Sequence, residues 1–399
     1  MGMEFRPYYF AKEWVSHGHT VTIVSADYSH LRRKNPIIKH DFQKDNIDGI
    51  TYVWIKTVKY KKNGIKRAVS VAQFLTKLWI KAKQITKTYQ PDVVIASSTY
   101  PLDTYIGQKI ARISRGKTKL IHEVHDMWPI SPIEIGGMSP KNPFIRILQR
   151  GEDSFCKNSD AVVSLLPATK DYFMKHGMSE NKFYHIPNGV VLEEWETPKP
   201  LPDHIQKQIV DDRSDGRYIL CFFGSINKTY NLEILIAAGK CMRDNEIAIY
   251  FIGDGNDKME LMNTAKGYED RFRFFDPIPK NTIPSLFNYI DASFVGAKSK
   301  KIFRFGIAMN KLFDSMMGMK PILYMVDAPN DYISQFECGV IVEGDNVEAL
   351  MNSMKKLIHL SPDEQVMMGK RGRKAAVEIF NYESLSQRFI AVMNEITRE

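Results

Sequence analysis

The chain has 399 residues, 44% of them hydrophobic, which is enough for two or three domains of ordinary size with buried cores. No apolar run approaches the roughly 18–20 residues that cross a bilayer, and the first ten residues lack the apolar core of a signal peptide, so we expect a cytoplasmic protein. The cysteines form no Cys-x-x-Cys pair, which argues against a zinc ribbon or a disulfide framework.

The net charge of +9 is concentrated in residues 31–87, which hold fifteen Lys or Arg residues against three Asp residues. Such a surface attracts a polyanion. Within it, residues 67–83 are predicted as an amphipathic helix, which either faces the core with a solvated basic back or rests on an anionic membrane. No nucleic-acid-binding motif is present, so we expect no nucleic-acid partner. The apolar residues at helical spacing are Val71, Phe74, Leu75, Leu78 and Trp79.

The first half of the chain alternates short Val- and Ile-rich strands with helices. It opens directly with a helix, without the strand and glycine-rich turn that normally begin a doubly wound domain. We expect either a start codon assigned too late or a sheet with an open place, and favour the late start. The strands are predicted at Thr20–Ala26, Thr51–Ile55, Asp92–Ser97, Lys119–Val124, Ala161–Leu166 and Lys182–Ile186. The helices are predicted at Phe5–His17, Val69–Tyr89, Leu102–Ser114 and Phe144–Lys157.

The second half repeats the alternation after a linker in which three prolines fall within residues 198–202. The predicted fold class is therefore α/β, with two doubly wound domains, parallel sheets and a ligand cleft beyond the carboxyl ends of the strands, between the domains. The strands are predicted at Arg217–Gly224, Ile247–Ile252, Phe272–Phe275, Ala292–Val295, Pro321–Met325 and Gly339–Val342. The helices include Leu232–Met242, Lys258–Ala265, Ile283–Tyr289, Asn310–Met317 and Val347–His359.

The segment that follows Lys119 carries His122, Glu123, His125 and Asp126 to the carboxyl end of a strand. A histidine at that position can donate to an oxyanion or a sugar hydroxyl near neutral pH, so His125 and Asp126 are candidate catalytic residues. The alternative is a histidine that caps the loop while Asp126 holds its imidazole. Because His122 and His125 should point to opposite faces of the strand, we expect no metal.

Two segments of the second half combine a strand, a glycine turn and a helix. After the strand that ends near Gly224, free amides and Lys228 suit a phosphate, although every doubly wound domain has such turns. The second segment, residues 295–321, is a basic loop that enters a helix. There the amides of residues 306–308 and Lys311 suit a diphosphate and Asp314 suits a ribose, whereas the alternative is a solvated lysine in an intrahelical ion pair.

With these motifs in view, the chain resembles the family-four retaining glycosyltransferases over nearly its whole length, and looks closest to the O-antigen and capsule branch that includes fucosamine-type transferases. The resemblance implies a GT-B fold, with domains at 1–195 and 196–381 and a final helix at 382–399 that crosses back to the first domain. It rests on EFRPYY from Glu4, GHTVTI from Gly18, EVHDMWP from Glu123, PNGV from Pro187, GDG from Gly253 and NKLFDSMMGMKP from Asn310.

The chain departs from the family pattern at three positions. Gly306 stands where the first Glu of the C-terminal motif is usual, Ser225 replaces an Arg, and Tyr230 replaces a Lys. Lys228, Arg304 and Lys311 are the candidate replacements for the missing positive charge. The donor-binding residues that we predict are Gly224, Ser225, Lys228, Pro277, Ile278, Arg304, Gly306, Ile307, Ala308, Lys311 and Asp314, with Glu4 and Arg6 on the acceptor side.

The resemblance implies transfer of a sugar from a UDP-sugar to a polyprenyl-diphosphate-linked saccharide, with retained anomeric configuration. An N-acetyl amino-deoxyhexose is one candidate for that sugar. No cofactor or metal is expected, because helix dipoles and basic side chains neutralise the leaving diphosphate. The partners are then a nucleotide sugar, a lipid-linked acceptor and the inner face of the plasma membrane. Two alternatives stay open: a UDP-sugar epimerase of the same fold, and a non-catalytic membrane-associated scaffold.

Overall fold

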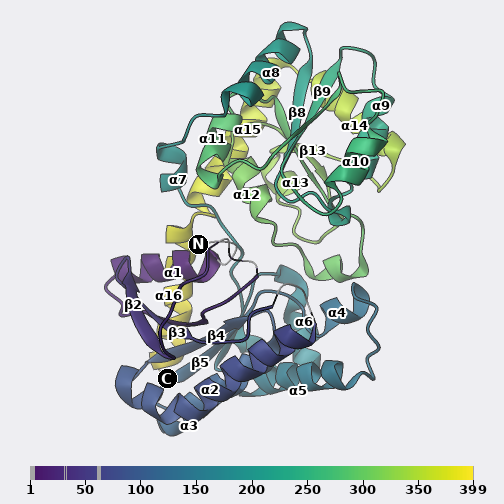
Figure 1. The fold of residues 1–399 in the computed structure, drawn as a ribbon. Helices are drawn as coiled ribbons and strands as arrows, with labels where there is room; N and C mark the ends of the chain where they lie inside the picture. The colour runs from purple at the N-terminus through teal and green to yellow at the C-terminus, as the bar shows by residue number, and fades with distance from the viewer. Residues whose placement is uncertain (1–4, 31, 33, 61–63, 399) are drawn as a thin grey trace. The chain divides into compact units, whose positions relative to one another are not determined.

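The computed structural model describes residues 5–398 except 31, 33 and 61–63, so Glu4 lies outside the described residues. The chain divides into two compact units (Figure 1): unit 1 comprises residues 1–187 and 382–399, and unit 2 comprises residues 188–381. The boundary lies before the expected residue 195 because Val190 is fully buried in unit 2, where its amide donates to the Phe380 carbonyl at 2.8 Å. No helix in the described residues is long and apolar enough to span a membrane.

Unit 1 contains most of the predicted elements, with ends shifted by a few residues. Its helices are α1 (Phe5–Ser16), α2 (Ile65–Tyr89), α3 (Thr104–Ile113), α4 (Ile130–Glu134), α5 (Pro143–Asn158), α6 (Lys170–Lys175) and α16 (Tyr382–Arg398). Its strands are β1 (Thr22–Ala26), β2 (Gln43–Ile47), β3 (Ile50–Ile55), β4 (Val93–Ser98), β5 (Lys119–Val124), β6 (Ala161–Ser164) and β7 (Phe183–His185).

The strands of unit 1 form two sheets, with the orders β1-β3-β2 and β4-β5-β6-β7. All neighbours are parallel except β2 and β3, which form a hairpin. The hairpin turn consists of Asp48 and Gly49, both with positive φ, as a type I′ turn requires. Strand β2 was not predicted because its sequence, QKDNI, is polar and is only half covered. Strands β1 and β4 each end a sheet, so the described part of unit 1 has an open place in its sheet structure.

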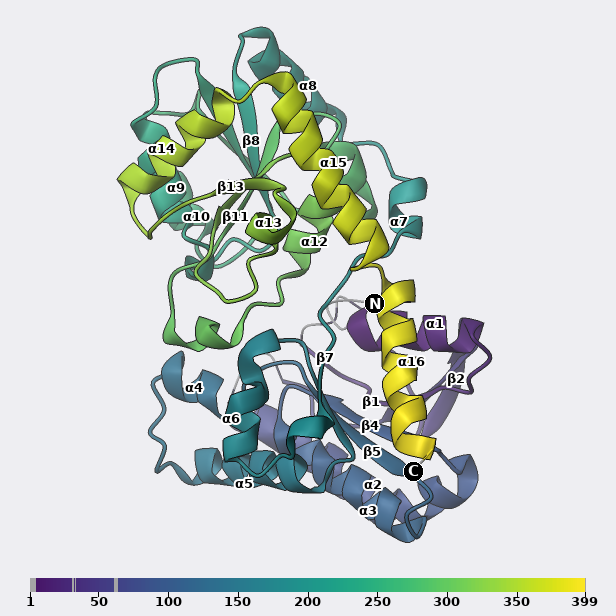
Figure 2. The ribbon, with the colours of Figure 1, turned by 180° about the vertical axis from the view of Figure 1, so that it is seen from behind.

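One apolar cluster joins the two sheets of unit 1. Ile55 of β3, Leu78 of α2 and Ile106 of α3 are buried together, and Val24 of β1 and Val94 of β4 pack against them. On the opposite side, α16 lies beside α1 (Figure 2). The two helices pack through aromatic rings, with the Phe10 and Phe389 centroids 5.4 Å apart. The last helix therefore belongs to unit 1.

Helix α2 buries part of the apolar face that the sequence predicts. Leu78 is buried, and Phe74 and Leu75 pack against the same cluster. Trp79 was also placed on the core face, but it is 44% exposed, and the Lys109 ammonium lies 4.0 Å from the centroid of its ring. Trp79 lies one residue beyond Leu78, so the helical rotation turns it out of the core.

Unit 2 has one six-stranded sheet in the order β10-β9-β8-β11-β12-β13, all parallel, which confirms the predicted doubly wound architecture. Buried clusters cover both faces. The strands are β8 (Tyr218–Phe223), β9 (Ile247–Ile252), β10 (Phe272–Phe275), β11 (Ala292–Gly296), β12 (Ile322–Met325) and β13 (Gly339–Ile341). The helices are α7 (Glu193–Glu196), α8 (Asp203–Ser214), α9 (Leu232–Lys240), α10 (Lys258–Thr264), α11 (Ile283–Leu286), α12 (Asn310–Met317), α13 (Tyr332–Phe336), α14 (Val347–Ile358) and α15 (Pro362–Glu378).

Candidate functional site

The carboxyl edge of the unit 2 sheet is built from glycine turns that pack directly on one another. Gly224 follows β8 with φ +116°, a conformation that favours glycine. A Cβ on Gly253, after β9, would lie 1.8 Å from the Gly224 carbonyl oxygen, and a Cβ on Gly255 would lie 1.9 Å from the Ile226 oxygen. The Ile226 amide donates to the Asp254 carbonyl at 2.8 Å. The backbone at this edge is therefore closely packed, while Gly224 itself is exposed.

Lys311 brings a positive charge to the same turn. It comes from the first turn of α12, and its Nζ lies 3.5 Å from the Cβ position of Gly224. The ammonium lies 3.6 Å from the ring centroid of Tyr230 and 3.8 Å from that of Phe222. Among the described residues this buried nitrogen has no hydrogen-bond partner, and burial lowers the pKa of Lys311 well below its usual value. A desolvated amine without a partner is a strong candidate for binding an anion.

The loop before α12 supplies fewer free amides than the sequence predicts. The Gly306 amide donates to the Phe303 carbonyl at 2.9 Å, and the Ile307 amide donates to Asn330 Oδ1 at 2.9 Å. Both residues are buried, so the prediction that their amides face a ligand is wrong. The Ala308 amide has no partner within the described residues, although its carbonyl accepts from an asparagine side chain at 2.9 Å. Of Gly306, Ile307 and Ala308, only Ala308 therefore has an amide that could donate to a ligand as predicted.

The other predicted cations are engaged elsewhere. Lys228 begins the 3-10 turn after β8, but its ammonium pairs with Glu260 at 3.1 Å and its amide donates to Asp257 at 2.7 Å. Arg304 lies on an exposed turn, where its guanidinium donates to the Lys301 carbonyl at 2.6 Å. Lys228 is therefore held in a solvent-exposed ion pair, and the Arg304 guanidinium is bonded within its own turn.

The remaining predicted donor residues have different environments. Ser225 is exposed beside Gly224, and its hydroxyl accepts from Asn227 at 3.2 Å. Pro277 and Ile278 follow β10 at the same edge of the sheet, Pro277 exposed and Ile278 half-buried. Asp314 is buried, which raises the pKa of its carboxyl to about 6. No ion pair joins Asp314 to Lys311, both of which the structure describes, so the intrahelical pair weighed from the sequence does not form.

In unit 1, the predicted His125 belongs to a charged network at the ends of β4 and β5. Its Nε2 lies 2.9 Å from Glu123 Oε2 and 2.8 Å from Ser97 Oγ. Burial favours a neutral Glu123, but Arg6, whose Nε donates to Glu123 Oε1 at 2.9 Å, together with His125, holds the pKa of that carboxyl well below its usual range. Beside an ionised Glu123, His125 Nε2 is the nitrogen that carries a proton, and in the neutral imidazole Nδ1 is then the acceptor.

The Arg6 side chain is therefore bonded to other groups of unit 1. Besides Glu123, its guanidinium donates to the carbonyls of Pro187 at 2.6 Å and Ile186 at 2.8 Å, and the residue is 6% exposed. The predicted acceptor contact by Arg6 is not compatible with these buried bonds. The partner role of Ser97 was missed, although parallel pairing of β4 with β5 sets Ser97 opposite Glu123 and would have indicated it.

Asp126 does not hold the His125 imidazole. Its Oδ1 accepts from the Met127 amide at 2.7 Å and the Ser131 hydroxyl at 2.6 Å, and its Oδ2 accepts from the Trp128 indole at 3.1 Å. These bonds fix the loop after β5, which is a structural role. The catalytic assignment of Asp126 has no geometric support in unit 1.

The two histidines of β5 diverge, as alternation predicts. His122 is buried against Phe155, with ring centroids 3.9 Å apart, and burial lowers its pKa to about 3. Near His125, burial raises the pKa of Asp103 to about 7, and its Oδ1 is buried without a hydrogen-bond partner among the described residues. Asp103 lies outside the motifs that marked the candidate residues.

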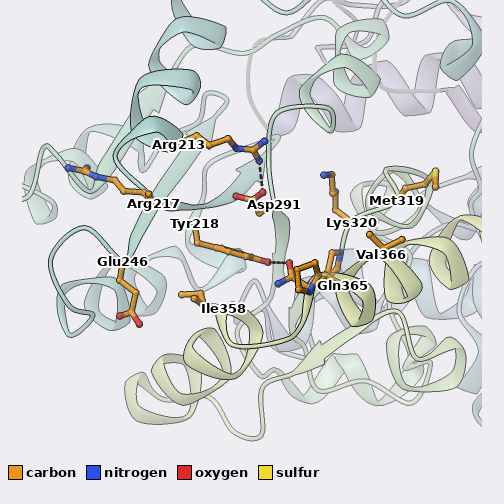
Figure 3. Close-up of a pocket in the computed structure, with 13 residues that line it drawn as sticks. Arg213, Arg217, Tyr218, Glu246, Asp291, Met319, Lys320, Ile358, Gln365 and Val366 are labelled. Atoms are coloured by element: carbon orange, nitrogen blue, oxygen red, sulfur yellow. Dashed lines mark hydrogen bonds and ion pairs between the residues drawn. The ribbon is translucent and has the colours of Figure 1, made fainter.

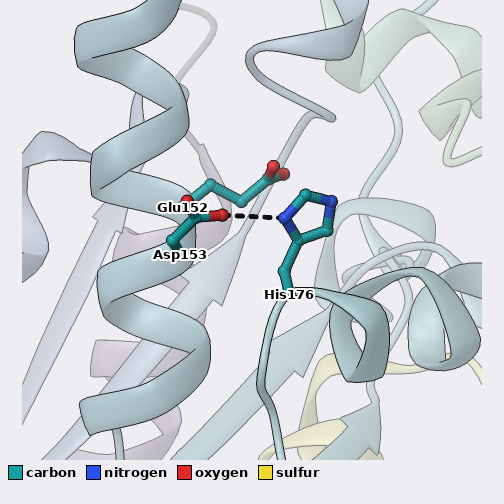
Figure 4. Close-up of side chains that lie close together, drawn as sticks. All are labelled: Glu152, Asp153 and His176. Carbon is teal, nitrogen blue, oxygen red and sulfur yellow. Dashed lines mark hydrogen bonds and ion pairs between the residues drawn. The ribbon is translucent and has the colours of Figure 1, made fainter.

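One group in the described residues, Glu152, Asp153 and His176, has the spacing of metal ligands (Figure 4), with ligand atoms within 4.8 Å of one another. One oxygen of each carboxylate already has protein partners: Tyr172 donates to Glu152 Oε2 at 2.6 Å and Gln149 donates to it at 2.7 Å, while His176 lies 2.7 Å from Asp153 Oδ1. Burial raises the pKa of Glu152 to about 8, which favours the neutral acid. The group is accounted for as a hydrogen-bonded cluster between α5 and α6.

Comparisons with known proteins agree with this architecture. Residues 2–194 match the model of Glycosyltransferase Family 4, and residues 205–375 match that of Glycosyl transferases group 1. A curated relative, the probable glycosyltransferase WbjE of Pseudomonas aeruginosa, is 23% identical over 279 residues, which span 67% of this chain and 66% of that protein.

Solved structures show the same fold. Sucrose-phosphate synthase from Thermosynechococcus elongatus is similar at a TM-score of 0.71, with 14% identity, over 100% of this chain and 94% of that chain. WaaG, a glycosyltransferase involved in lipopolysaccharide biosynthesis, matches at 0.65 with 15% identity over 97% and 94%. Anabaena HepE in complex with UDP matches at 0.64 with 14% identity over 86% of each chain. Two family models in tandem on this fold identify the chain as a glycosyltransferase of the GT-B type, with a family 4 domain followed by a group 1 domain.

Proposed function

We propose that this glycosyltransferase moves a sugar from a UDP-sugar to a polyprenyl-diphosphate-linked saccharide, with retention at the anomeric carbon, in the synthesis of a cell-surface polysaccharide. The observation that carries the donor half of this proposal is the unpartnered Lys311 ammonium beside the Gly224 turn. Structures of HepE with UDP and UDP-glucose support a nucleotide-sugar donor on this fold. Amino-deoxyhexoses are among the candidates for the transferred sugar.

The chemistry asks for a group that stabilises the departing diphosphate. As the bond from the anomeric carbon to the phosphate oxygen breaks, the carbon becomes oxocarbenium-like and negative charge grows on the diphosphate. We assign the neutralisation of that charge to Lys311, the Ala308 amide and the Ser225 hydroxyl. The acceptor hydroxyl attacks the face that the diphosphate leaves, and its proton passes to the departing phosphate oxygen. Asp314 remains our candidate for the ribose, and Pro277 and Ile278 for the base.

In unit 1 the proposal retains His125 and assigns it a contact with a sugar hydroxyl. Its Nδ1 is the acceptor nitrogen because Glu123 and Ser97 bond Nε2, so a hydroxyl donates to Nδ1. Arg6, Glu123 and Ser97 then act as positioning residues that fix the tautomer and orientation of the ring. The structure leaves Asp126 and Arg6 with the internal bonds described above, and neither is kept as a reacting group.

The membrane partner is supported by a strip on α2. Ile65 is 84% exposed, Val69 42% and Ile80 69%, and these residues project on one side of the helix with Trp79. Exposed lysines, including Lys83, continue the same strip toward the end of the helix. Apolar side chains beside basic ones suit the surface of an anionic bilayer. We propose that unit 1 rests peripherally on the inner face of the plasma membrane through this strip.

Sedimentation with lipid vesicles tests the membrane part separately. We expect the protein to bind phosphatidylglycerol vesicles in preference to phosphatidylcholine vesicles, and Ile80→Glu to weaken that binding. Met259→Glu is the matched control, because Met259 is 68% exposed on α10 of unit 2. Equal binding by Ile80→Glu and the wild type would remove the strip from the proposal.

Product analysis tests the reaction. The purified protein is incubated with a panel of UDP-sugars, with and without a polyprenyl-diphosphate-linked saccharide, and products are identified by mass spectrometry and NMR. We expect transfer that requires the acceptor and keeps the anomeric configuration. Isomerised UDP-sugar without acceptor would indicate an epimerase instead. Failure to bind any of UDP, GDP and ADP in calorimetry would indicate a non-catalytic scaffold.

A further inference from the structure

Unit 2 has a cavity of about 580 Å³ at the edge of its sheet opposite the glycine turns (Figure 3). Its lining residues stand at the starts of strands: Tyr218 opens β8, Asp291 precedes β11, and Lys320 and Pro321 precede β12. Parallel strands place all their amino ends at one edge and all their carboxyl ends at the other, so this cavity is separate from the candidate donor site. Its volume lies within the usual range of small-molecule sites, roughly 300–1,000 Å³.

The charges that line the cavity leave one cation without a partner. Asp291 accepts from the Ile219 amide at 2.8 Å through Oδ2 and pairs with Arg213 through Oδ1, so its charge is already compensated. Arg217 pairs with Asp212 at 3.4 Å, and in Figure 3 its side chain extends away from the other labelled residues. Lys320 forms no hydrogen bond or ion pair within the described residues; burial lowers its pKa, and the nearby Asp291 charge opposes that shift in part. The cavity therefore presents a half-buried ammonium.

The rest of the lining is apolar apart from Tyr218, Gln365 and Glu246, and the Glu246 carboxylate accepts from the Arg243 amide at 3.3 Å through Oε2. Met319 is 39% exposed and Val366 50%, and Pro321, Ile358 and Pro362 complete that wall. A polar point remains where the Tyr218 hydroxyl donates to Gln365 Oε1 at 3.0 Å, as Figure 3 shows. Exposed methionine and valine side chains around a single cation suit a ligand with an apolar body and one anionic group.

We propose that this cavity is a second binding site, for a small organic anion that carries a carboxylate or a phosphate on an alkyl or aromatic frame. Lys320 binds the anionic group, and Met319, Ile358 and Val366 cover the apolar body. Because the site lies at the amino edge of the sheet, its occupancy does not depend on the proposed donor chemistry.

The fluorescent anion anilinonaphthalene sulfonate tests the site in the full-length protein. We expect saturable binding that decanoate displaces but that inorganic phosphate at equal ionic strength and UDP do not. Lys320→Gln should weaken the dye about tenfold, the usual worth of one hydrogen bond to a charged group. Val366→Glu, which places a negative charge at the mouth, should also weaken it.

The matched control is Lys374→Gln, which should leave the dye affinity unchanged. It removes an exposed lysine that lies outside the cavity, on the helix α15 that also carries Val366. Dye affinities are compared only among variants whose thermal midpoints match that of the wild type. Wild-type dye affinity in both Lys320→Gln and Val366→Glu would overturn the proposal. Competitive displacement by UDP would overturn it as well, because the dye would then occupy the donor site. If phosphate displaced the dye as effectively as decanoate does, the site would not recognise the apolar body of the ligand, and that part of the proposal would be wrong.

Discussion

Replacing Lys311 with methionine should stabilise the free protein and weaken UDP binding at once. In the absence of a ligand the Lys311 ammonium is buried with no hydrogen-bond partner among the described residues, and its contacts are the rings of Tyr230 and Phe222 at 3.6 and 3.8 Å. Burying an ion costs several kcal/mol. Each ring returns about 2 kcal/mol at most. Methionine keeps the ring contacts without the charge, so we expect a gain of roughly 2 kcal/mol, or about 4–8 °C in thermal midpoint.

The same change removes the cation that we assign to the diphosphate. Loss of a charge-assisted bond corresponds to a roughly 10- to 150-fold weaker affinity for UDP, measured by titration calorimetry. Lys266→Met is the control, since Lys266 is exposed elsewhere in unit 2. Since burial lowers the pKa of Lys311 and a diphosphate would raise it again, UDP should bind with proton uptake in the wild type, but not in the variant, at pH values where the free protein has lost the Lys311 proton. A less stable Lys311→Met protein with unchanged UDP affinity would refute the reasoning.

Three further changes probe other parts of the structure. Burial raises the pKa of Glu152 from 4.5 to about 8, so the folded state binds the proton more tightly and the wild type loses stability as the pH rises through that window. In urea unfolding curves, the free energy of unfolding of Glu152→Gln should exceed that of the wild type by about 2 kcal/mol at pH 8 and should not exceed it at pH 4. Gly253→Ala should cost roughly 3 kcal/mol and weaken UDP binding, since the new methyl group would meet the Gly224 oxygen; a thermal midpoint within error of wild type would contradict the packing. Arg6→Met should cost about 3–5 kcal/mol, since Glu123 would stay buried without its partner, and a neutral result in chemical denaturation would show that the pair is dispensable.

The fold was predictable because its elements have strong local signals. Ile247–Ile252 is apolar throughout and Asn310–Met317 has helical periodicity, and both were placed with the observed ends. The polar β2 was missed because its pairing is set by the Asp48–Gly49 turn and by β3, not by its own side chains. Helix α8 was missed because its sequence, DHIQKQIVDDRS, is dominated by charged and polar residues.

The positions of the candidate residues in the fold were predictable, but their hydrogen bonds were not. Strand alternation placed His125 beside Glu123, and Lys311 fell at the start of a helix near a glycine turn. What failed were assignments that depend on distant partners: the Ile307 amide is taken by Asn330, and Lys228 is paired with Glu260. Sequence spacing tells which groups face an edge of a sheet, but only the packed chain tells which of them are already satisfied.

The most direct test of the donor site is a crystal structure of the protein with UDP. The account predicts a phosphate oxygen within hydrogen-bond distance of Lys311 Nζ, with the diphosphate against the turn at Gly224 and near the amide of Ala308. A diphosphate bound elsewhere on unit 2, with the Lys311 ammonium still enclosed between Tyr230 and Phe222, would contradict it.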